Sequence, residues 1–181
     1  MGKKITMHLS VKDIRRVQNE LREYQQDLNR KCELFCRKLA ECGIEVAKQN
    51  TGGYGKYIAF SIKVSSDKNG CKVLMVATNT GLIHSEWMTQ DGVKSADVSP
   101  LMMAEFGSGL KANNPNAERF GMGTGTFPGQ THATDPNGWY WMDLDGNWHH
   151  SSGITPTMPM YHAATEVILN IRKIAKEVFS K

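Results

Sequence analysis

The feature that most constrains this fold is a long helical pattern near the start of the chain. Apolar side chains recur there at steps of three or four residues, which keeps them on one face of a helix. They are Ile14, Val17, Leu21, Tyr24, Leu28, Cys32, Phe35, Leu39, Cys42 and Val46. The pattern predicts one very long helix or two consecutive helices. An amphipathic helix of this length needs partners along its whole apolar face.

Local signals fix both ends of this helical region. Ser10 offers a side-chain oxygen to the free N–H groups of a helix that starts near residue 11, and Asp13 suits its positive end. No proline or glycine interrupts the pattern before Gly43. Residues 50–53 tolerate the left-handed backbone conformation that ends many helices, so the helix is expected to end there. Before the helix, the alternation over residues 5–9 predicts a short strand.

Strand signals follow the helix. Residues 56–65 and 71–77 are rich in Ile, Val and Phe, and Asn69-Gly70 between them favours a tight turn. We therefore predict an antiparallel hairpin, with a third strand over residues 82–88. A short helix over residues 99–107 has a proline in its first turn and a glycine at its end.

The remaining residues predict a long loop, a second hairpin and a final helix. Residues 107–138 are rich in Gly, Asn, Thr and Pro, which indicates a flexible arm. Residues 157–179 predict a second amphipathic helix, whose apolar stripe is Val167, Ile168, Ile171, Ile174, Ala175 and Val178. The expected fold is α+β, with a small antiparallel sheet packed against the long N-terminal helix, or two consecutive helices, and a C-terminal helix. We predict one domain over residues 1–181, with an inserted Gly-rich loop and aromatic hairpin at about 107–150.

The aromatic hairpin spans residues 139–150. Asp145-Gly146 supplies a two-residue turn between β-prone arms. With that turn, residue 143 faces 148 and residue 141 faces 150. The side chains of one face would then be Trp139, Trp141, Trp148 and His150.

Catalytic, cofactor and metal signatures are missing from the sequence. There is no Gly-x-Ser-x-Gly elbow, and glycine-rich residues 121–126 lack the Lys-Ser/Thr of a phosphate-binding loop. Residues 143–154 lack the sixth-position Gly and twelfth-position Glu of a calcium loop. His149 and His150 point to opposite faces of a strand. We expect no enzyme activity, no cofactor and no metal.

The charge distribution and the cysteines limit which kinds of partner and metal site are expected. The net charge is +4, with basic and acidic residues interleaved, so at most non-specific contact with DNA is expected. No stretch approaches the roughly 20 apolar residues that span a bilayer, so no membrane partner is expected. We expect the cysteines to be reduced and to pack as small apolar residues, without a disulfide framework. Cys32 and Cys36 could supply two zinc ligands, but the second Cys or His pair of a zinc finger is missing.

Two short motifs, in order, resemble a family of tailed-phage tail-completion or head–tail joining (neck) proteins. The first motif reads x-P-x-x-x-E-F-G-[ST], and residues 99–108 resemble it, with one more residue between Pro100 and Glu105. The second reads P-x-x-P-[FM]-[LMY]-x-x-A at the start of a final helix, and residues 156–164 match it, with Met160 where Phe is more usual. The long N-terminal helix and the hairpin are also similar, so the resemblance covers roughly residues 10–181.

The resemblance implies a structural virion protein, assembled in the bacterial cytoplasm and similar in role to the lambda minor tail protein Z. It would form a hexameric ring with itself, between the head connector or stopper and the tail terminator or tail tube. No catalytic residue is implied. The candidate contacts between subunits or rings are Glu105, Phe106, Gly107, Trp139, Trp141, Trp148, Pro156, Pro159 and Met160.

A rival interpretation comes from the aromatic hairpin. Residues 138–147 resemble one choline-binding repeat of cell-wall-attached proteins, whose aromatic faces stack on sugars or enclose a quaternary ammonium. Such modules build each site between successive repeats, and this chain has one copy. A cell-wall, choline or glycan-binding module is therefore the alternative to a neck protein.

Overall fold

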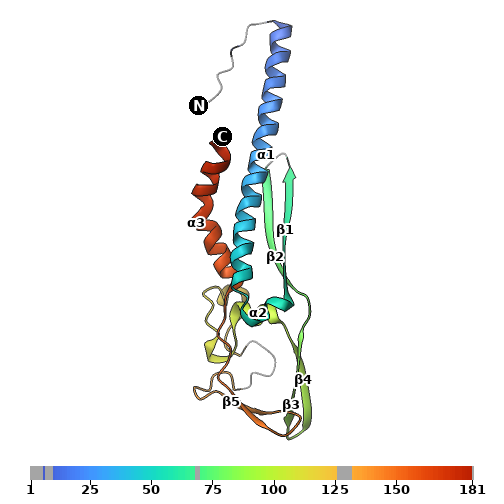
Figure 1. Cartoon of the computed structure of the whole chain (residues 1–181), viewed down its shortest axis with the longest axis vertical. Coiled ribbons are helices and arrows are strands. Elements are labelled where there is room, and N and C mark those ends of the chain that lie inside the picture. The colour runs from blue at the N-terminus through green and yellow to red at the C-terminus, as the bar shows by residue number, and fades with distance from the viewer. Residues whose placement is uncertain (1–5, 7–9, 68–69, 126–131, 181) are drawn as a thin grey trace.

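The computed structural model describes residues 6, 10–67, 70–125 and 132–180. The molecule is elongated, with two helices and a two-stranded hairpin at one end and a four-stranded sheet at the other (Figure 1). The predicted α+β class, with small antiparallel sheets, a long N-terminal helix and a C-terminal helix, is confirmed.

The N-terminal pattern forms one continuous helix, α1 (Val11–Gln49, 39 residues). Of the two expected alternatives, the single helix is therefore right. Ser10 caps it as predicted, because its hydroxyl oxygen accepts the Asp13 N–H at 3.2 Å. At 1.5 Å per residue the helix is about 58 Å long. The strand predicted over residues 5–9 lies, apart from Thr6, outside the described residues.

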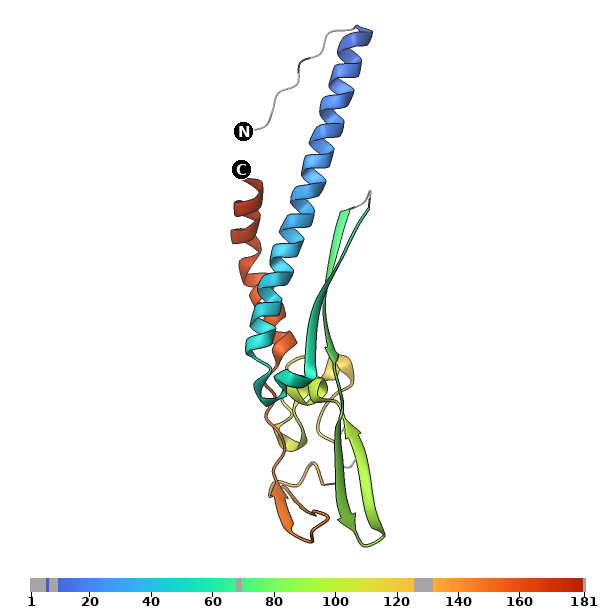
Figure 2. The ribbon, with the colours of Figure 1, turned by 45° about the vertical axis from the view of Figure 1, so that its right-hand side comes forward.

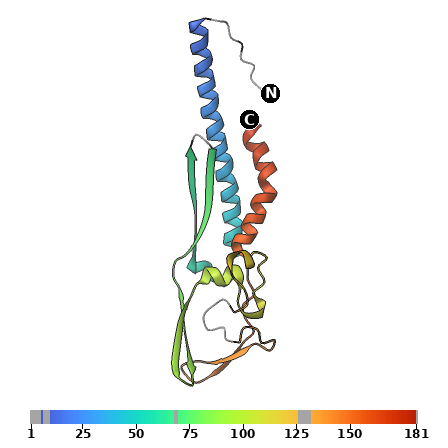
Figure 3. The ribbon, with the colours of Figure 1, turned by 180° about the vertical axis from the view of Figure 1, so that it is seen from behind.

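The C-terminal half of α1 lies between helix α3 (Pro159–Phe179) and the hairpin of β1 (Ile58–Asp67) and β2 (Gly70–Asn79), as Figures 1 and 3 show. Both neighbours approach α1 closely at Gly43. A Cβ atom there would lie 2.6 Å from Met75 Sδ of β2 and 2.9 Å from Val167 Cγ2 of α3. Small buried residues of α1, including Ala40 and Ala47, let the two layers come this close.

The predicted first hairpin is confirmed and is longer than expected, pairing from Ile58 with Asn79 to Asp67 with Gly70. The second sheet has the strand order β4-β3-β5-β6. Its strands are β3 (Ile83–Thr89), β4 (Gly92–Val98), β5 (Trp139–Met142) and β6 (Trp148–Ser151). Strand β3 was predicted and β4 was missed, although Asp91-Gly92 before it is a turn signal.

The helix α2 (Pro100–Phe106) joins the two ends of the molecule, and the predicted long loop begins after it. We predicted a flexible arm, but the described parts of that loop pack against the rest of the protein. Asn114 and Ala133 are buried, and the Phe120 ring lies 5.9 Å from the Phe106 ring. Residues 126–131 lie outside the description.

Candidate functional site

A buried carboxylate, Glu105, connects α2 to the start of α3. One of its oxygens accepts the Met160 N–H at 2.7 Å and the other accepts the Tyr161 N–H at 3.0 Å. The residue that precedes α3, Met158, provides no side-chain cap of its own. Because the first N–H groups of a helix lack partners within the helix and carry partial positive charge, a carboxylate stabilises them. Glu105 is therefore a long-range cap for α3.

Asn114 holds this carboxylate from the loop side. Its amide Nδ2 donates to Glu105 Oε1 at 3.0 Å and to the Glu105 backbone oxygen at 2.7 Å. The exposed fractions are 9% for Glu105 and 4% for Asn114. The loop after α2 thus contributes a buried polar side chain to the helix cap, a contact that the sequence pattern did not predict.

Gly107 lets the chain leave α2 and pass close to the segment before α3. Its φ is 71°, and a Cβ atom there would lie 2.3 Å from the Ile154 carbonyl oxygen and 2.7 Å from Pro156 Cδ. Next to it, Ser108 and Ile154 exchange two backbone hydrogen bonds of 2.9 and 3.1 Å. A side chain at position 107 would therefore separate the two segments.

These contacts bring the two sequence motifs together into one junction. The backbone oxygen of Ala104 accepts the N–H groups of Thr157 and Met158, which adds to the Glu105 cap. The predicted contact residues that are buried in the junction are Glu105, Phe106, Gly107, Pro156 and Pro159, and Met160 is half-buried. Within the chain these residues hold α2, the loop and α3 together. Their role between subunits stays a prediction.

The aromatic hairpin has a different register from the predicted one. Trp141 pairs with His149 and Met142 pairs with Trp148. The prediction that Trp139, Trp141, Trp148 and His150 share a face is therefore wrong. The loop contains three residues, 144–146, closed by the Asp143 N–H donating to the Asn147 oxygen at 3.0 Å. With one more loop residue than predicted, every side chain of the second strand moves to the other face.

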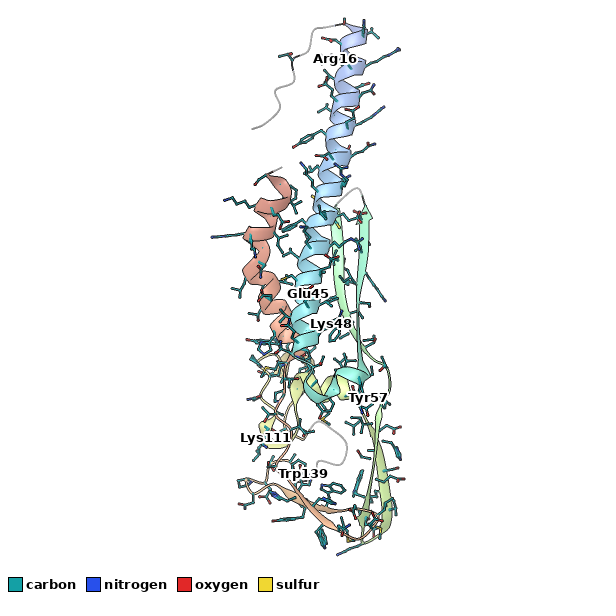
Figure 4. The ribbon with its side chains drawn as sticks, viewed as in Figure 1. Arg16, Glu45, Lys48, Tyr57, Lys111 and Trp139 are labelled. Atoms are coloured by element: carbon teal, nitrogen blue, oxygen red, sulfur yellow. The ribbon has the colours of Figure 1, made fainter. Side chains whose placement is uncertain are left out.

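The corrected register divides the aromatic side chains into an inner and an outer set. Trp139, at the opposite end of the molecule from Arg16 in Figure 4, packs on the chain at Gly109. Trp141 stacks on His149 with ring centroids 4.5 Å apart. Tyr140 and Trp148 share the other face, and each is 69% exposed. The exposed aromatic surface is thus Tyr140 with Trp148, and Tyr140 was not predicted as a site residue.

The hairpin loop is organised around the carboxylate of Asp143. It accepts the N–H groups of Asp145 and Asn147 and lies 2.7 Å from His149 Nε2. The hydrogen bond with His149, followed by that from the Asn147 backbone, lowers the pKa of Asp143 from 3.8 to about 2. Hydrogen bonds donated to a carboxylate stabilise its ionised form.

A pH titration of this loop is expected to report the lowered pKa. The ionised Asp143 stabilises the hairpin above its ordinary pKa of 3.8, and the contribution is lost as pH falls through about 2. In NMR spectra, the Asn147 amide should titrate with a midpoint near 2. Asp145→Asn, in the same loop, should preserve that midpoint, and Asp143→Asn should remove it. A midpoint near 3.8 in the wild type would contradict the hydrogen-bonded loop.

A second candidate surface is the N-terminal half of α1, which extends beyond both α3 and the first hairpin (Figures 1 and 2). Its apolar stripe contains Ile14, Val17, Leu21, Tyr24 and Leu28. Leu21 is 51% exposed and Tyr24 is 62% exposed. Ile168 and Leu169, two residues of α3, are also exposed. We call the five residues on α1 the N-terminal stripe.

In the part of the chain that the structure describes, no cluster of three or more His, Cys, Asp or Glu side chains is arranged to hold a metal ion. In that same part, each helix is either too short or too polar to cross a membrane. Comparison with known proteins gives no match, whether to a family model, a curated protein or a solved structure.

Proposed function

We propose that this chain is a structural subunit of a tailed-phage virion, a tail-completion or neck protein. It would form a ring with copies of itself between the head connector or stopper and the tail terminator or tail tube. The order of the two motifs, the long N-terminal helix and the following hairpin support the proposal. No catalytic role is part of it.

The observation that carries the proposal is the N-terminal stripe. It continues the helix face whose residues are half-buried further along α1, where the Phe35 ring lies 5.8 Å from the Phe179 ring of α3. Beyond α3 that face has no cover from the described residues. Since most helical stability in proteins comes from packing an apolar face, such an extension gains stability when a partner covers it.

Neighbouring subunits are the partners that a ring supplies. In a cyclic assembly every copy offers the same surfaces, so an apolar face that is incomplete in one subunit is completed by the next subunit or by the adjoining ring. Exposed apolar residues of α3, including Ile168 and Leu169, add to the surface available for such contacts. The subunit is thus expected to bury more apolar area in the assembly than alone.

Leu21→Glu is expected to weaken assembly without changing the subunit fold. Burial of a leucine contributes about 1.5–3 kcal/mol, so its loss should weaken association roughly ten- to a hundredfold per contact. The far-UV circular dichroism should stay unchanged, because Leu21 is exposed in the subunit. Sedimentation measures the association, alone and with purified tails or connectors.

The matched control is Gln26→Glu, which adds the same charge on the polar face of α1. It should assemble like the wild type. Equal assembly of Leu21→Glu and the wild type would contradict a role for the N-terminal stripe. A wild type that stays monomeric at high concentration and binds neither tails nor connectors would contradict the proposed function.

The second candidate function is glycan or choline binding at the aromatic hairpin. The observation in its favour is the exposed pair of Tyr140 and Trp148 on one face of β5 and β6. Aromatic faces of this kind stack on sugars or attract quaternary ammonium groups. Tryptophan fluorescence, titrated with choline and with cell-wall fragments, should shift and saturate in the wild type and not in Trp148→Ala. An unchanged wild-type spectrum would dismiss this function.

A further inference from the structure

The outer face of α3 carries an apolar stripe with the same kind of spacing as the N-terminal stripe of α1. Ile168 is 68% exposed and Ile171 is 42% exposed, whereas the buried Ile174 lies on the face that packs inside the chain. At steps of four, three and four, the residues of this stripe are Ala164, Ile168, Ile171 and Ala175. We call them the outer α3 stripe.

Steps of three and four residues are the spacing with which two helices pack along a seam. The N-terminal stripe, from Ile14 to Leu28, is about 21 Å long and the outer α3 stripe is about 17 Å long. Within one chain the two stripes do not meet. Helix α3 ends where its Phe179 ring lies 5.8 Å from the Phe35 ring of α1, and the N-terminal stripe lies beyond that point (Figure 2). Each stripe is therefore left for a partner outside the chain.

The start of the N-terminal stripe has an acidic edge. Asp13 and Glu20 flank the stripe on one side, one heptad apart, and both carboxylates pair with Arg16, at 3.1 and 2.8 Å. Two carboxylates and one guanidinium leave a net negative charge at this edge. The flanking positions on the other side are Gln18 and Gln25, which are uncharged. We call Asp13 and Glu20 the acidic edge.

The outer α3 stripe has a basic edge. Arg172 and Lys176 lie beside it on the solvent-exposed side of α3. In the ranges that the structure describes, no ion pair engages either side chain. Leu169, which is 72% exposed, lies on the same side one turn before Arg172 and widens the apolar surface. The two stripes are thus both apolar and opposite in the charge of their edges.

We propose that the N-terminal stripe of one copy packs against the outer α3 stripe of the next copy, with the acidic edge facing Arg172 and Lys176. The inference rests on the proposed ring, because it names the surface that covers the N-terminal stripe there. Each copy has one stripe of each kind. Contacts between two different surfaces pass from copy to copy, so a closed ring gives every stripe a partner.

A second N-terminal stripe is a poorer partner for the first. Its flanking positions hold Asp13, Glu20, Gln18 and Gln25, none of which is positively charged. Charges at such positions select which helices pair and in which direction. Contact between two identical surfaces also ends at a dimer, because each copy has then used its surface. The outer α3 stripe supplies the opposite charge and lets a ring form.

A photo-cross-linker in the N-terminal stripe tests the pairing in the full-length protein. Tyr24→p-benzoylphenylalanine is a suitable variant, because it keeps an aromatic ring at a position that is 62% exposed. In assembled particles, irradiation should join position 24 to residues 164–176 of another copy, which a mixture of isotopically light and heavy copies identifies by mass spectrometry. The same group at Gln26, on the polar face of α1, should give no such product. Cross-links from position 24 to α1 of another copy, to a connector or tail protein, or to no protein in rings that form would overturn the pairing.

Two further variants separate this pairing from the proposed function. Ile168→Glu copies that carry the cross-linker keep the N-terminal stripe, and Leu21→Glu copies keep the outer α3 stripe. Both residues are exposed, so both variants should keep the wild-type circular dichroism. In a mixture, the first should capture the second roughly tenfold or more over one another, and equal capture would overturn the pairing. The mixture needs no virion component. Capture without a ring in particles would contradict only the proposed function, and a ring without this capture would contradict only the pairing.

Discussion

Replacing Glu105 with alanine is expected to lower the free energy of unfolding by about 2–4 kcal/mol. The carboxylate accepts the first N–H groups of α3 and the amide of Asn114, all inside the protein. Removing it leaves these donors without their acceptor and takes a negative charge away from the start of a helix. Urea unfolding followed by circular dichroism measures the change.

Two variants calibrate that result. Glu105→Gln keeps one carbonyl acceptor but loses the charge, so it should lose roughly half as much stability as the alanine variant. Glu118→Ala removes an exposed carboxylate from the same loop and should stay within about 0.5 kcal/mol of the wild type. Equal stability of Glu105→Ala and Glu118→Ala would contradict a long-range cap for α3.

Replacing Gly107 with alanine is expected to lower the free energy of unfolding by about 3 kcal/mol or more. The added Cβ would lie 2.3 Å from the Ile154 carbonyl oxygen, and a φ of 71° is unfavourable for alanine. The clash is with backbone, so no side-chain rotation relieves it. Thermal unfolding measures the loss, which should appear as a lower Tm or as unfolded protein.

Gly81→Ala is the matched control for this substitution. A Cβ atom at Gly81 meets nothing within 4 Å, and its φ is not in the left-handed region. The alanine variant should therefore be as stable as the wild type to within about 0.5 kcal/mol. If Gly107→Ala were equally stable, the close approach of the α2 exit to the segment before α3 would be contradicted.

These two expectations change what the family-like motifs mean in this chain. The Glu and Gly of the first motif and the prolines of the second make contacts within this chain, where they join α2 to α3. These contacts account for the fold of the chain, and a contact of the same residues with a neighbouring copy stays a prediction. The surface on which assembly is best tested is therefore the N-terminal stripe of α1.

The parts of the fold that sequence reasoning predicted correctly depend on local patterns. The apolar repeat that located α1, the Ser10 cap and the β-prone residues of the first hairpin each act over a few residues. Periodicity also located α3, but only approximately its buried face, since Ile168 and Ile171 of the predicted stripe are exposed. What covers a helix depends on its neighbours, which periodicity does not identify.

The features that were missed depend on distant contacts or on one residue of loop length. Glu105 and the start of α3 are 55 positions apart, and no local pattern pairs them. In the aromatic hairpin, Asp-Gly suggested a two-residue turn, whereas Asp143 closes a wider loop. That single residue moved Trp148 to the face of Tyr140.

We propose that this chain forms a ring between head and tail. Electron cryomicroscopy of particles assembled from connector-bearing heads and purified tails, with and without this protein, tests it most directly. With the protein, we predict a ring of its copies between connector and tail, α1 extending from each copy, and a rise in joined particles that Leu21→Glu abolishes. Joining at the same yield without the protein, or junctions that contain none of it, would contradict the claim.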